Sequence, residues 1–277
     1  GLTGRGVRVA VLDSGIDATH PDLRGKVVAA ANFSDSGTTT DRFGHGTHVA
    51  SIVAGTGARA AGQRRGVAFG ASLLNAKVLD DFGFGSESGV IAGMEWAAGQ
   101  RARVANLSLG AGPTDGSDPV SQALDRISAR SRVLFVVSAG NDGPRAQTVS
   151  SPGSATAALT VGAVDVHEAL ADFSSRGPRF GDYAMKPDVT APGVDVVAAR
   201  ATGTSLGDPV DQWYTRLSGT SMAAPHVAGA AAVLAQQWPD WSPARIKSVL
   251  MGTAAPNPEL GVYQQGGGRL DVAHAVT

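Results

Sequence analysis

The chain repeats a simple pattern: a short apolar run, a turn marked by Gly or Asp, and a stretch of small residues with helical character. The run Val7–Leu12 is almost unbroken in β-branched and aliphatic residues, which is typical of a strand buried on both faces. Four similar runs predict further strands, at Ser72–Leu79, Val104–Leu109, Val133–Ser138 and Leu159–Val164. Three segments with helical spacing lie between them, at His48–Ala54, Glu87–Gly99 and Pro119–Arg130. This alternation predicts an α/β fold with a mainly parallel central sheet and helices on both faces.

Two further helices are predicted near the end of the chain. Met222–Gln237 contains seven alanines and Gly229, so neighbouring segments can approach it closely and we expect it to be buried. Ser242 is a plausible N-cap for the next helix, with Pro243 at its first position. Because no linker, internal repeat or low-complexity tract interrupts the chain, residues 1–277 are predicted to form a single domain.

Composition and charge exclude several classes of protein. The 23 basic and 24 acidic side chains leave a net charge of −1, so there is no basic field for a nucleic-acid partner. No apolar run approaches the ~20 residues that cross a bilayer, which argues against a membrane protein. Cysteine is absent, which excludes disulfides, thiolate metal sites and cysteine nucleophiles. The features of a signal peptide are missing at Gly1, so an exported protein would be a mature or trimmed form.

Polar residues that follow the predicted strands are candidates for chemistry, because ligand sites of open parallel sheets lie at the carboxyl ends of the strands. Asp13 directly follows the first strand, and His45 lies between two glycines that allow other groups to approach its ring. A carboxylate that holds one imidazole nitrogen leaves the other free to accept a proton. Taken alone, Asp13 is more typical of an Asx turn or a helix cap.

A metal site is the competing interpretation for this histidine. His45, His48 and Asp41 could supply three ligands, but the zinc pattern H-E-x-x-H is missing. We therefore expect His48 to be a hydrogen-bonded structural residue.

Ser221 and Asn141 complete the candidate set. Ser221 opens the alanine-rich helix, where free backbone N–H groups favour developing negative charge. Asn141 follows the strand at Val133–Ser138, and its amide could donate to an oxyanion beside a serine nucleophile. An ordinary N-cap serine and a turn asparagine are the structural alternatives.

Together these motifs resemble the subtilisin-like serine proteases, the subtilases. The matching segments are Val11–Asp17, His20–Leu23, Gly44–Ala50, Ser138–Asn141 and Gly219–His226, in the family's order along most of the chain, from about Val7 to Thr253. The resemblance implies a three-layer fold and peptide-bond hydrolysis by an endopeptidase through an acyl-enzyme. In that mechanism Ser221 is the nucleophile, His45 its base and Asp13 the residue that orients His45. The Ser221 N–H and the Asn141 side chain would form the oxyanion hole.

The resemblance also implies a substrate groove. Its expected residues are Ser108, Leu109, Gly110, Ser138, Ala139, Gly140, Ser150 and Gly153. The small residues near its base predict a roomy, uncharged first specificity pocket and a broad preference for large apolar side chains. We identify no acid at a pocket position, which argues against strict cleavage after paired basic residues.

Calcium is the main departure from the family pattern. No catalytic cofactor is expected, but the family has a tight structural calcium site with an aspartate that matches Asp22. The loop at residues 55–66 contains three arginines and no carboxylate or asparagine, so this site is expected to be lost or remodelled. Asp208 and Asp211 are either a weaker ion site or, as we favour, solvated surface acids. Trp213 and Tyr214 either shape the leaving-group side or pack the loop.

The expected partners are protein or peptide substrates and an N-terminal propeptide, with no nucleic acid and no membrane. By family analogy the protein is expected to be a secreted monomer. Two alternatives remain: an exopeptidase or selective processing enzyme with the same residues, and a catalytically silent binding module. The presence of Asp13, His45, Asn141 and Ser221 favours an active enzyme. A nucleotide-binding α/β protein is disfavoured because neither G-x-G-x-x-G nor the Walker string occurs.

Overall fold

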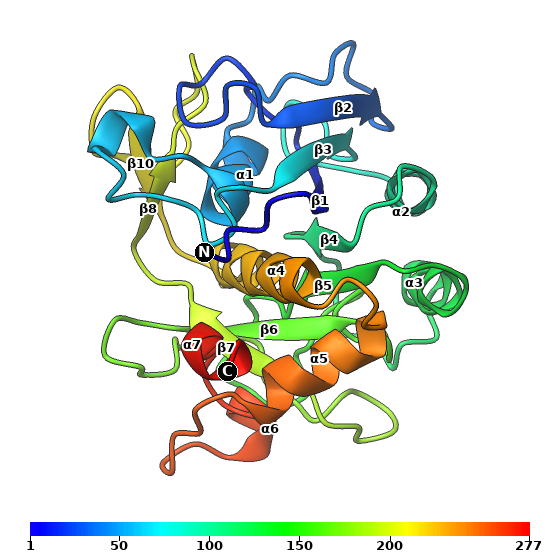
Figure 1. The fold of residues 1–277 in the computed structure, drawn as a ribbon. Coiled ribbons are helices and arrows are strands. Elements are labelled where there is room, and N and C mark those ends of the chain that lie inside the picture. The colour runs from blue at the N-terminus through cyan, green and yellow to red at the C-terminus, as the bar shows by residue number, and fades with distance from the viewer.

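The computed structural model describes residues 1–277 and is built around one seven-stranded sheet (Figure 1). All neighbouring strands run parallel, in the order β2-β3-β1-β4-β5-β6-β7. The strands are β1 Arg8–Asp13, β2 Val27–Asn32, β3 Ser72–Lys77, β4 Val104–Leu107, β5 Leu134–Ser138, β6 Leu159–Val164 and β7 Val189–Pro192. The parallel central sheet predicted from the sequence is confirmed.

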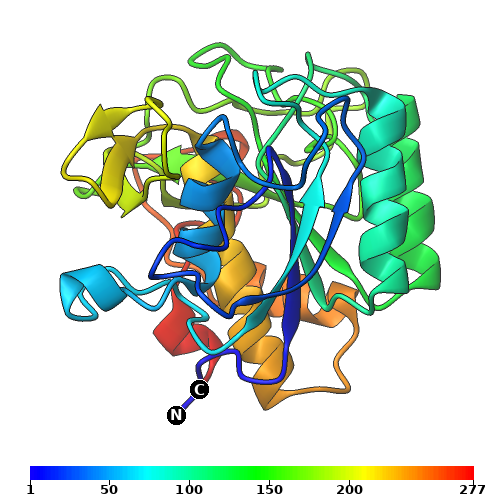
Figure 2. The ribbon, with the colours of Figure 1, turned by 90° about the horizontal axis from the view of Figure 1, so that it is seen from above.

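Helices cover both faces of this sheet. Helices α2 and α3 lie side by side over one face, whereas α1, α4 and α5 lie on the other (Figure 2). The longer helices are α1 His45–Ala54, α2 Glu87–Gly99, α3 Pro119–Arg130, α4 Thr220–Gln237 and α5 Pro243–Gly252. Shorter ones are the 3-10 turn η1 Ala58–Ala60, α6 Val262–Gln265 and α7 Val272–Ala275. None of these helices is long and apolar enough to cross a lipid bilayer.

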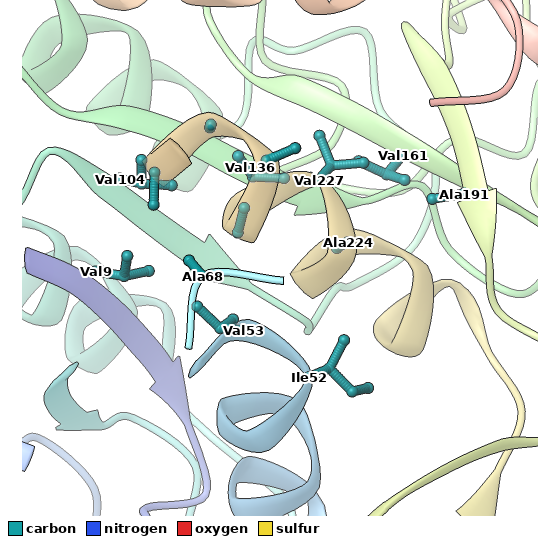
Figure 3. Packing of buried hydrophobic residues seen from close by; sticks show 14 of the residues in the cluster. Val9, Ile52, Val53, Ala68, Val104, Val136, Val161, Ala191, Ala224 and Val227 are labelled. Carbon is teal, nitrogen blue, oxygen red and sulfur yellow. The ribbon is translucent and has the colours of Figure 1, made fainter. Parts of the chain in front are cut away.

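Successive strand residues divide between two apolar layers, because side chains alternate across a sheet. On β1, Val9 and Val11 face the layer under α1 and α4, whereas Ala10 and Leu12 face α2 and α3. Valines from neighbouring strands continue the first layer and meet α4 there (Figure 3). Helix α4 is buried along most of its length, as its alanine content predicts. A Cβ at Gly229 would lie 2.6 Å from Val67 Cβ, so glycine is needed there.

Several element boundaries differ from the sequence prediction. Helix α1 begins at His45 rather than His48, because tertiary contacts fix a glycine-rich first turn whose intrinsic helix propensity is low. Helix α4 begins at Thr220, two residues before the predicted start. Strand β2 was not predicted, and it is a half-exposed edge strand with alternating burial. The N-cap prediction for Ser242 is confirmed, since its hydroxyl accepts from the Arg245 N–H at 3.1 Å.

A second, three-stranded antiparallel sheet was also not predicted. It has the order β8-β10-β9, from β8 Val196–Ala199, β9 Asp208–Pro209 and β10 Tyr214–Leu217. This small sheet packs beside α1 (Figure 1). Its strands are two to four residues long, which is too short for a periodic signal.

Candidate active site

Asp13 and His45 meet at the carboxyl edge of the main sheet. Asp13 is the last residue of β1 and His45 is the first residue of α1. The His45 Nδ1 atom lies 2.8 Å from Asp13 Oδ1, which also accepts the Ser14 N–H at 2.7 Å. The side chain of Asp13 is 1% exposed and that of His45 is 17% exposed, so the pair is covered but the imidazole still reaches the surface. With Nδ1 bonded to the carboxylate, Nε2 is left to exchange protons.

Glycine allows this close approach between β1 and α1. A Cβ at Gly46 would lie 2.1 Å from the Gly15 carbonyl oxygen and 3.2 Å from Asp13 Oδ1. Gly44, on the other side of His45, has a φ of 107°, in the left-handed region that favours glycine. Steric constraints therefore explain why glycine stands on both sides of His45 in the sequence motif.

Two opposing effects act on the pKa of His45. Burial alone would lower it, since the charged imidazolium loses water contacts. The nearby carboxylates of Asp13 and Asp41 stabilise the charged ring, and the net result is a pKa above its ordinary value of 6.5. A histidine that accepts a proton becomes an imidazolium, and this site stabilises that charged form of His45.

Ser221 lies at the second position of α4, at the same edge of the sheet. Its hydroxyl donates to the Ser108 carbonyl at 3.3 Å, and the structure contains no hydrogen bond between Ser221 and His45. Ser108 Oγ in turn donates to the Ser221 carbonyl at 2.8 Å, which ties α4 to the segment after β4. In enzymes without bound substrate, the hydrogen bond between a serine nucleophile and its histidine base is often long and forms fully only when substrate binds.

The side chain of Asn141 is fixed by the first residue of α4. Its Oδ1 accepts the Thr220 N–H at 2.9 Å and the Thr220 hydroxyl at 3.0 Å. Because Oδ1 is used as the acceptor, the Nδ2 group is left to donate into the cavity that Asn141 and Ser221 share. This arrangement places an amide donor beside the Ser221 side chain.

That cavity has a volume of about 240 Å³. Five of the eight residues expected in the groove line it or its rim: Leu109, Gly110, Ser138, Gly140 and Ser150. Ser108 lines the neighbouring groove instead, whereas Ala139 and Gly153 are buried and line neither of these two cavities. The expectation that no acid stands at a pocket position needs correction, because the exposed Asp142 also lines this cavity.

A larger groove of about 470 Å³ continues from the segment Ser108–Thr114 and includes His45. Its apolar walls include Phe43, Leu79 and Phe84, which the sequence analysis did not single out. The signal for Phe84 was its place in an exposed segment in which phenylalanines alternate with glycines, at residues 82–85. An extended chain bound along residues 108–112 would therefore have an apolar pocket on one side and the smaller cavity on the other.

His48 and Asp41 do not join His45 in a ligand cluster. His48 Nε2 lies 3.1 Å from the Val196 carbonyl and 3.2 Å from the Thr215 carbonyl, so it is a hydrogen-bonded structural residue as expected. Burial lowers its pKa to about 3, which keeps it neutral. No group of three or more His, Cys, Asp or Glu residues in the structure is arranged to hold a metal ion.

Asp22, the candidate calcium ligand, lies in a different environment. It is buried, and its two oxygens accept from the Arg59 N–H at 3.2 Å and the Tyr214 hydroxyl at 2.8 Å. The Arg59 guanidinium lies 4.6 Å from the ring centre of Trp213, and that of Arg64 lies 4.7 Å from the ring centre of Tyr214. Both aromatic residues thus pack the loop at residues 55–66 against the small sheet. Asp211 caps its own turn by accepting the Trp213 and Tyr214 N–H groups.

Comparisons with known proteins identify the family of this chain. The sequence model of the subtilase family matches residues 4–269. Serine protease AprX of Bacillus subtilis is 38% identical over 90% of this chain, which spans 61% of the length of that relative. Subtilisin DY of Bacillus licheniformis is 39% identical and Subtilisin Savinase of Lederbergia lenta is 40% identical, each over 96% of this chain and 90% of the relative.

A solved structure gives the same result in three dimensions. The crystal structure of a cold adapted subtilisin-like serine proteinase superimposes with a TM-score of 0.77 at 31% identity, covering 98% of this chain and 89% of the other. The family match includes all seven strands of the main sheet and the helices α1 to α5 that cover it. The chain belongs to the subtilase family of serine proteases.

Proposed function

We propose that this chain is an endopeptidase that cleaves peptide bonds through an acyl-enzyme. Ser221 Oγ bonds to the scissile carbonyl carbon while its proton passes to His45 Nε2, and Asp13 holds the imidazolium that results. The C–N bond then breaks as His45 returns the proton to the leaving amine. A water molecule, activated by the same imidazole, hydrolyses the ester and frees Ser221. The 2.8 Å contact between His45 Nδ1 and Asp13 Oδ1 is the observation that carries this proposal.

The oxyanion of each tetrahedral intermediate would lie between the Ser221 N–H and the Asn141 amide. The first turn of α4 supplies free N–H groups at this point, and Thr220 fixes the orientation of the asparagine. Rotation about the Ser221 Cα–Cβ bond would break the 3.3 Å hydrogen bond to Ser108, which is long and therefore weak. The nucleophile is thus restrained only lightly before substrate arrives.

A fluorophosphonate probe followed by peptide mapping tests the proposal. Labelling is expected at Ser221, and it should disappear in Ser221→Ala but persist in Ser150→Ala, a matched serine variant in the same cavity. Folded protein that takes up no label would instead favour the silent binding module. A peptide library then separates internal cleavage from removal of terminal residues, which would indicate the exopeptidase alternative.

We propose that the cavity beside Ser221 accepts large apolar or aromatic side chains N-terminal to the cut. Its volume of about 240 Å³ and its wall of glycine, alanine and serine leave room for such groups. Asp142 at the edge adds a carboxylate that a long basic side chain can reach. In the peptide library, Asp142→Asn should therefore lower cleavage after Lys and Arg while cleavage after Phe and Leu stays unchanged. An equal change for both classes would contradict the role of Asp142.

We propose that no calcium ion binds at Asp22. A hard cation needs several oxygen ligands, but both Asp22 oxygens already accept hydrogen bonds and two guanidinium groups lie nearby. The melting temperature of the Ser221→Ala protein, in which autolysis is prevented, should be equal in EDTA and in calcium buffer. A stabilisation by calcium that disappears in Asp22→Asn would overturn this.

We also propose an extracellular location, which rests on family membership alone. Detection of the mature chain in culture medium, by antibody and mass spectrometry, tests it; recovery only from washed cells would contradict it.

A further inference from the structure

Asp41 is a buried carboxylate that the proposed reaction does not use directly. It precedes His45 by four residues, is 1% exposed, and accepts hydrogen bonds on both oxygens. Oδ1 accepts from the Ser14 hydroxyl at 2.9 Å, the Phe43 N–H at 3.1 Å and the Gly44 N–H at 2.7 Å. Oδ2 accepts the Thr47 N–H at 2.8 Å. Burial and the charge of Asp13 raise the pKa of Asp41 above its ordinary value, whereas these hydrogen bonds, in which every partner donates, favour the ionised carboxylate.

The same hydrogen bonds connect Asp41 to the Asp13–His45 pair. Ser14 forms the bridge: its N–H donates to Asp13 Oδ1 at 2.7 Å, and its hydroxyl accepts the Gly46 N–H at 3.0 Å while donating to Asp41. Asp41 therefore holds the first turn of α1 through Gly44 and Thr47 and holds the end of β1 through Ser14. The two elements that carry Asp13 and His45 are therefore both held by one buried carboxylate.

A buried ammonium also contacts the residue after β1 and the residue that precedes Asp41. The side chain of Lys77, at the end of β3, is fully buried, and its Nζ donates to the Ser14 carbonyl and to the Thr40 carbonyl. It also forms an ion pair with Asp81 at 2.9 Å. Ser14 and Thr40 are therefore held by the charged side chain of Lys77, and Ser14 is also held by that of Asp41.

We propose that Asp41 is a positioning residue for the Asp13–His45 pair, which fixes the imidazole through the first turn of α1 and stabilises its protonated form by its negative charge. The inference rests on the proposed protease function. A cap that only stabilised the helix would affect folding, but it would not change the proton affinity of His45. The two roles are therefore distinguishable by titration.

Few other charges act on the imidazole. Asp13 on β1 faces it directly, and the two histidines on the neighbouring helical surfaces, His48 on α1 and His226 on α4, both have pKa values lowered by burial. On β3, the ammonium of Lys77 is directed at Ser14, Thr40 and Asp81. Removing the charge of Asp41 should therefore change the titration of His45 in one direction, toward lower pH.

The experiment is an NMR titration of the His45 ring in the Ser221→Ala protein, with and without Asp41→Asn. Loss of the carboxylate should lower the pKa of His45, because a nearby negative charge stabilises the imidazolium. Asp17→Asn is the matched control, because Asp17 is also a buried carboxylate that accepts loop N–H groups, from Thr19 and Thr202. It should leave the titration of His45 unchanged. Equal pKa values in the Asp41→Asn and parent proteins would overturn the electrostatic role.

Ser14→Ala is the second variant and keeps all charges in place. Removal of the bridging hydroxyl should lower kcat by roughly tenfold or more at nearly constant KM, since small displacements of a base are costly. The acid limb of the pH–rate profile of this variant should have the same midpoint as that of the parent protein. A kcat equal to that of the parent would overturn the positioning role. The titration does not require activity, so a protein with no protease activity would refute the proposed function while the effect of Asp41 on His45 remained measurable.

Discussion

The contact between Tyr214 and Asp22 tests how the loop at residues 55–66 is held against the small sheet. The Tyr214 hydroxyl donates to Asp22 Oδ2 at 2.8 Å, and the two residues are only 2% and 1% exposed. Tyr214→Phe keeps the ring under the Arg64 guanidinium but removes the donor. One oxygen of a buried carboxylate is then left without a partner, which is the costly case for a hydrogen bond.

The magnitude follows from this geometry. A hydrogen bond to a charged group contributes about 1.5–3 kcal/mol. For domains slightly smaller than this one, each kcal/mol changes the melting temperature by about 2–4 °C, so Tyr214→Phe should melt about 3–12 °C below the parent. Much of the loss should persist at high salt, because a buried contact is screened less than a surface pair.

The assay is calorimetry at one fixed scan rate in the Ser221→Ala background, which removes autolysis. Tyr263→Phe is the matched control: Tyr263 is 40% exposed and its hydroxyl forms no hydrogen bond in the structure, so its melting temperature should stay at the parental value. If Tyr214→Phe and Tyr263→Phe melt together, the Tyr214–Asp22 contact does not hold the loop and the reasoning is refuted.

Three further predictions concern the site and the core. Gly46→Ala places a Cβ 2.1 Å from the Gly15 carbonyl oxygen and should lower kcat/KM by about a hundredfold, whereas Gly99→Ala, with no atom within 4 Å of the new Cβ, should leave it unchanged. The carboxylates beside His45 raise its pKa above 6.5 despite burial, and the protonated ring cannot accept a proton from Ser221. We therefore expect kcat/KM to fall as the pH drops through that raised value, and a midpoint below 6.5 in the pH–rate profile would contradict this. Lys186→Met breaks the buried 2.8 Å ion pair with Asp188 and should lower the free energy of unfolding, measured in urea titrations, by about 3 kcal/mol or more. Lys247→Met removes the 3.2 Å ion pair of Lys247 with the same carboxylate, and a larger loss in that variant would contradict the prediction.

The parts of the fold that the sequence predicted are those in which local and tertiary preferences agree. Helices α2 and α3 have the predicted boundaries, because Ser86 and Asp118 cap them and α3 has Pro119 at its start. The half-exposed edge strand β2 and the short strands of the small sheet carry little periodic signal. The first turn of α1 was missed because Asp41 and Ser14 hold it, and neither contact is visible in local propensity.

The site divides in the same way. The positions of Asp13 and Asn141 follow from a general rule, since residues after parallel strands gather at one edge of the sheet. Lining residues such as Phe43, Phe84 and Asp142 come from loops whose relative placement depends on packing between distant segments. No spacing rule in the sequence connects Phe84 with Ser108, although both line the same groove.

The position of the proposed nucleophile late in the chain has a consequence for biosynthesis. Ser221 lies on α4, and this helix is buried against strands that are made much earlier, including β1, β4 and β5. A ribosome-bound chain therefore carries Asp13 and His45 long before it carries the Ser221 hydroxyl. On the proposed mechanism, the nascent polypeptide cannot cleave peptide bonds before α4 has emerged and packed against the sheet.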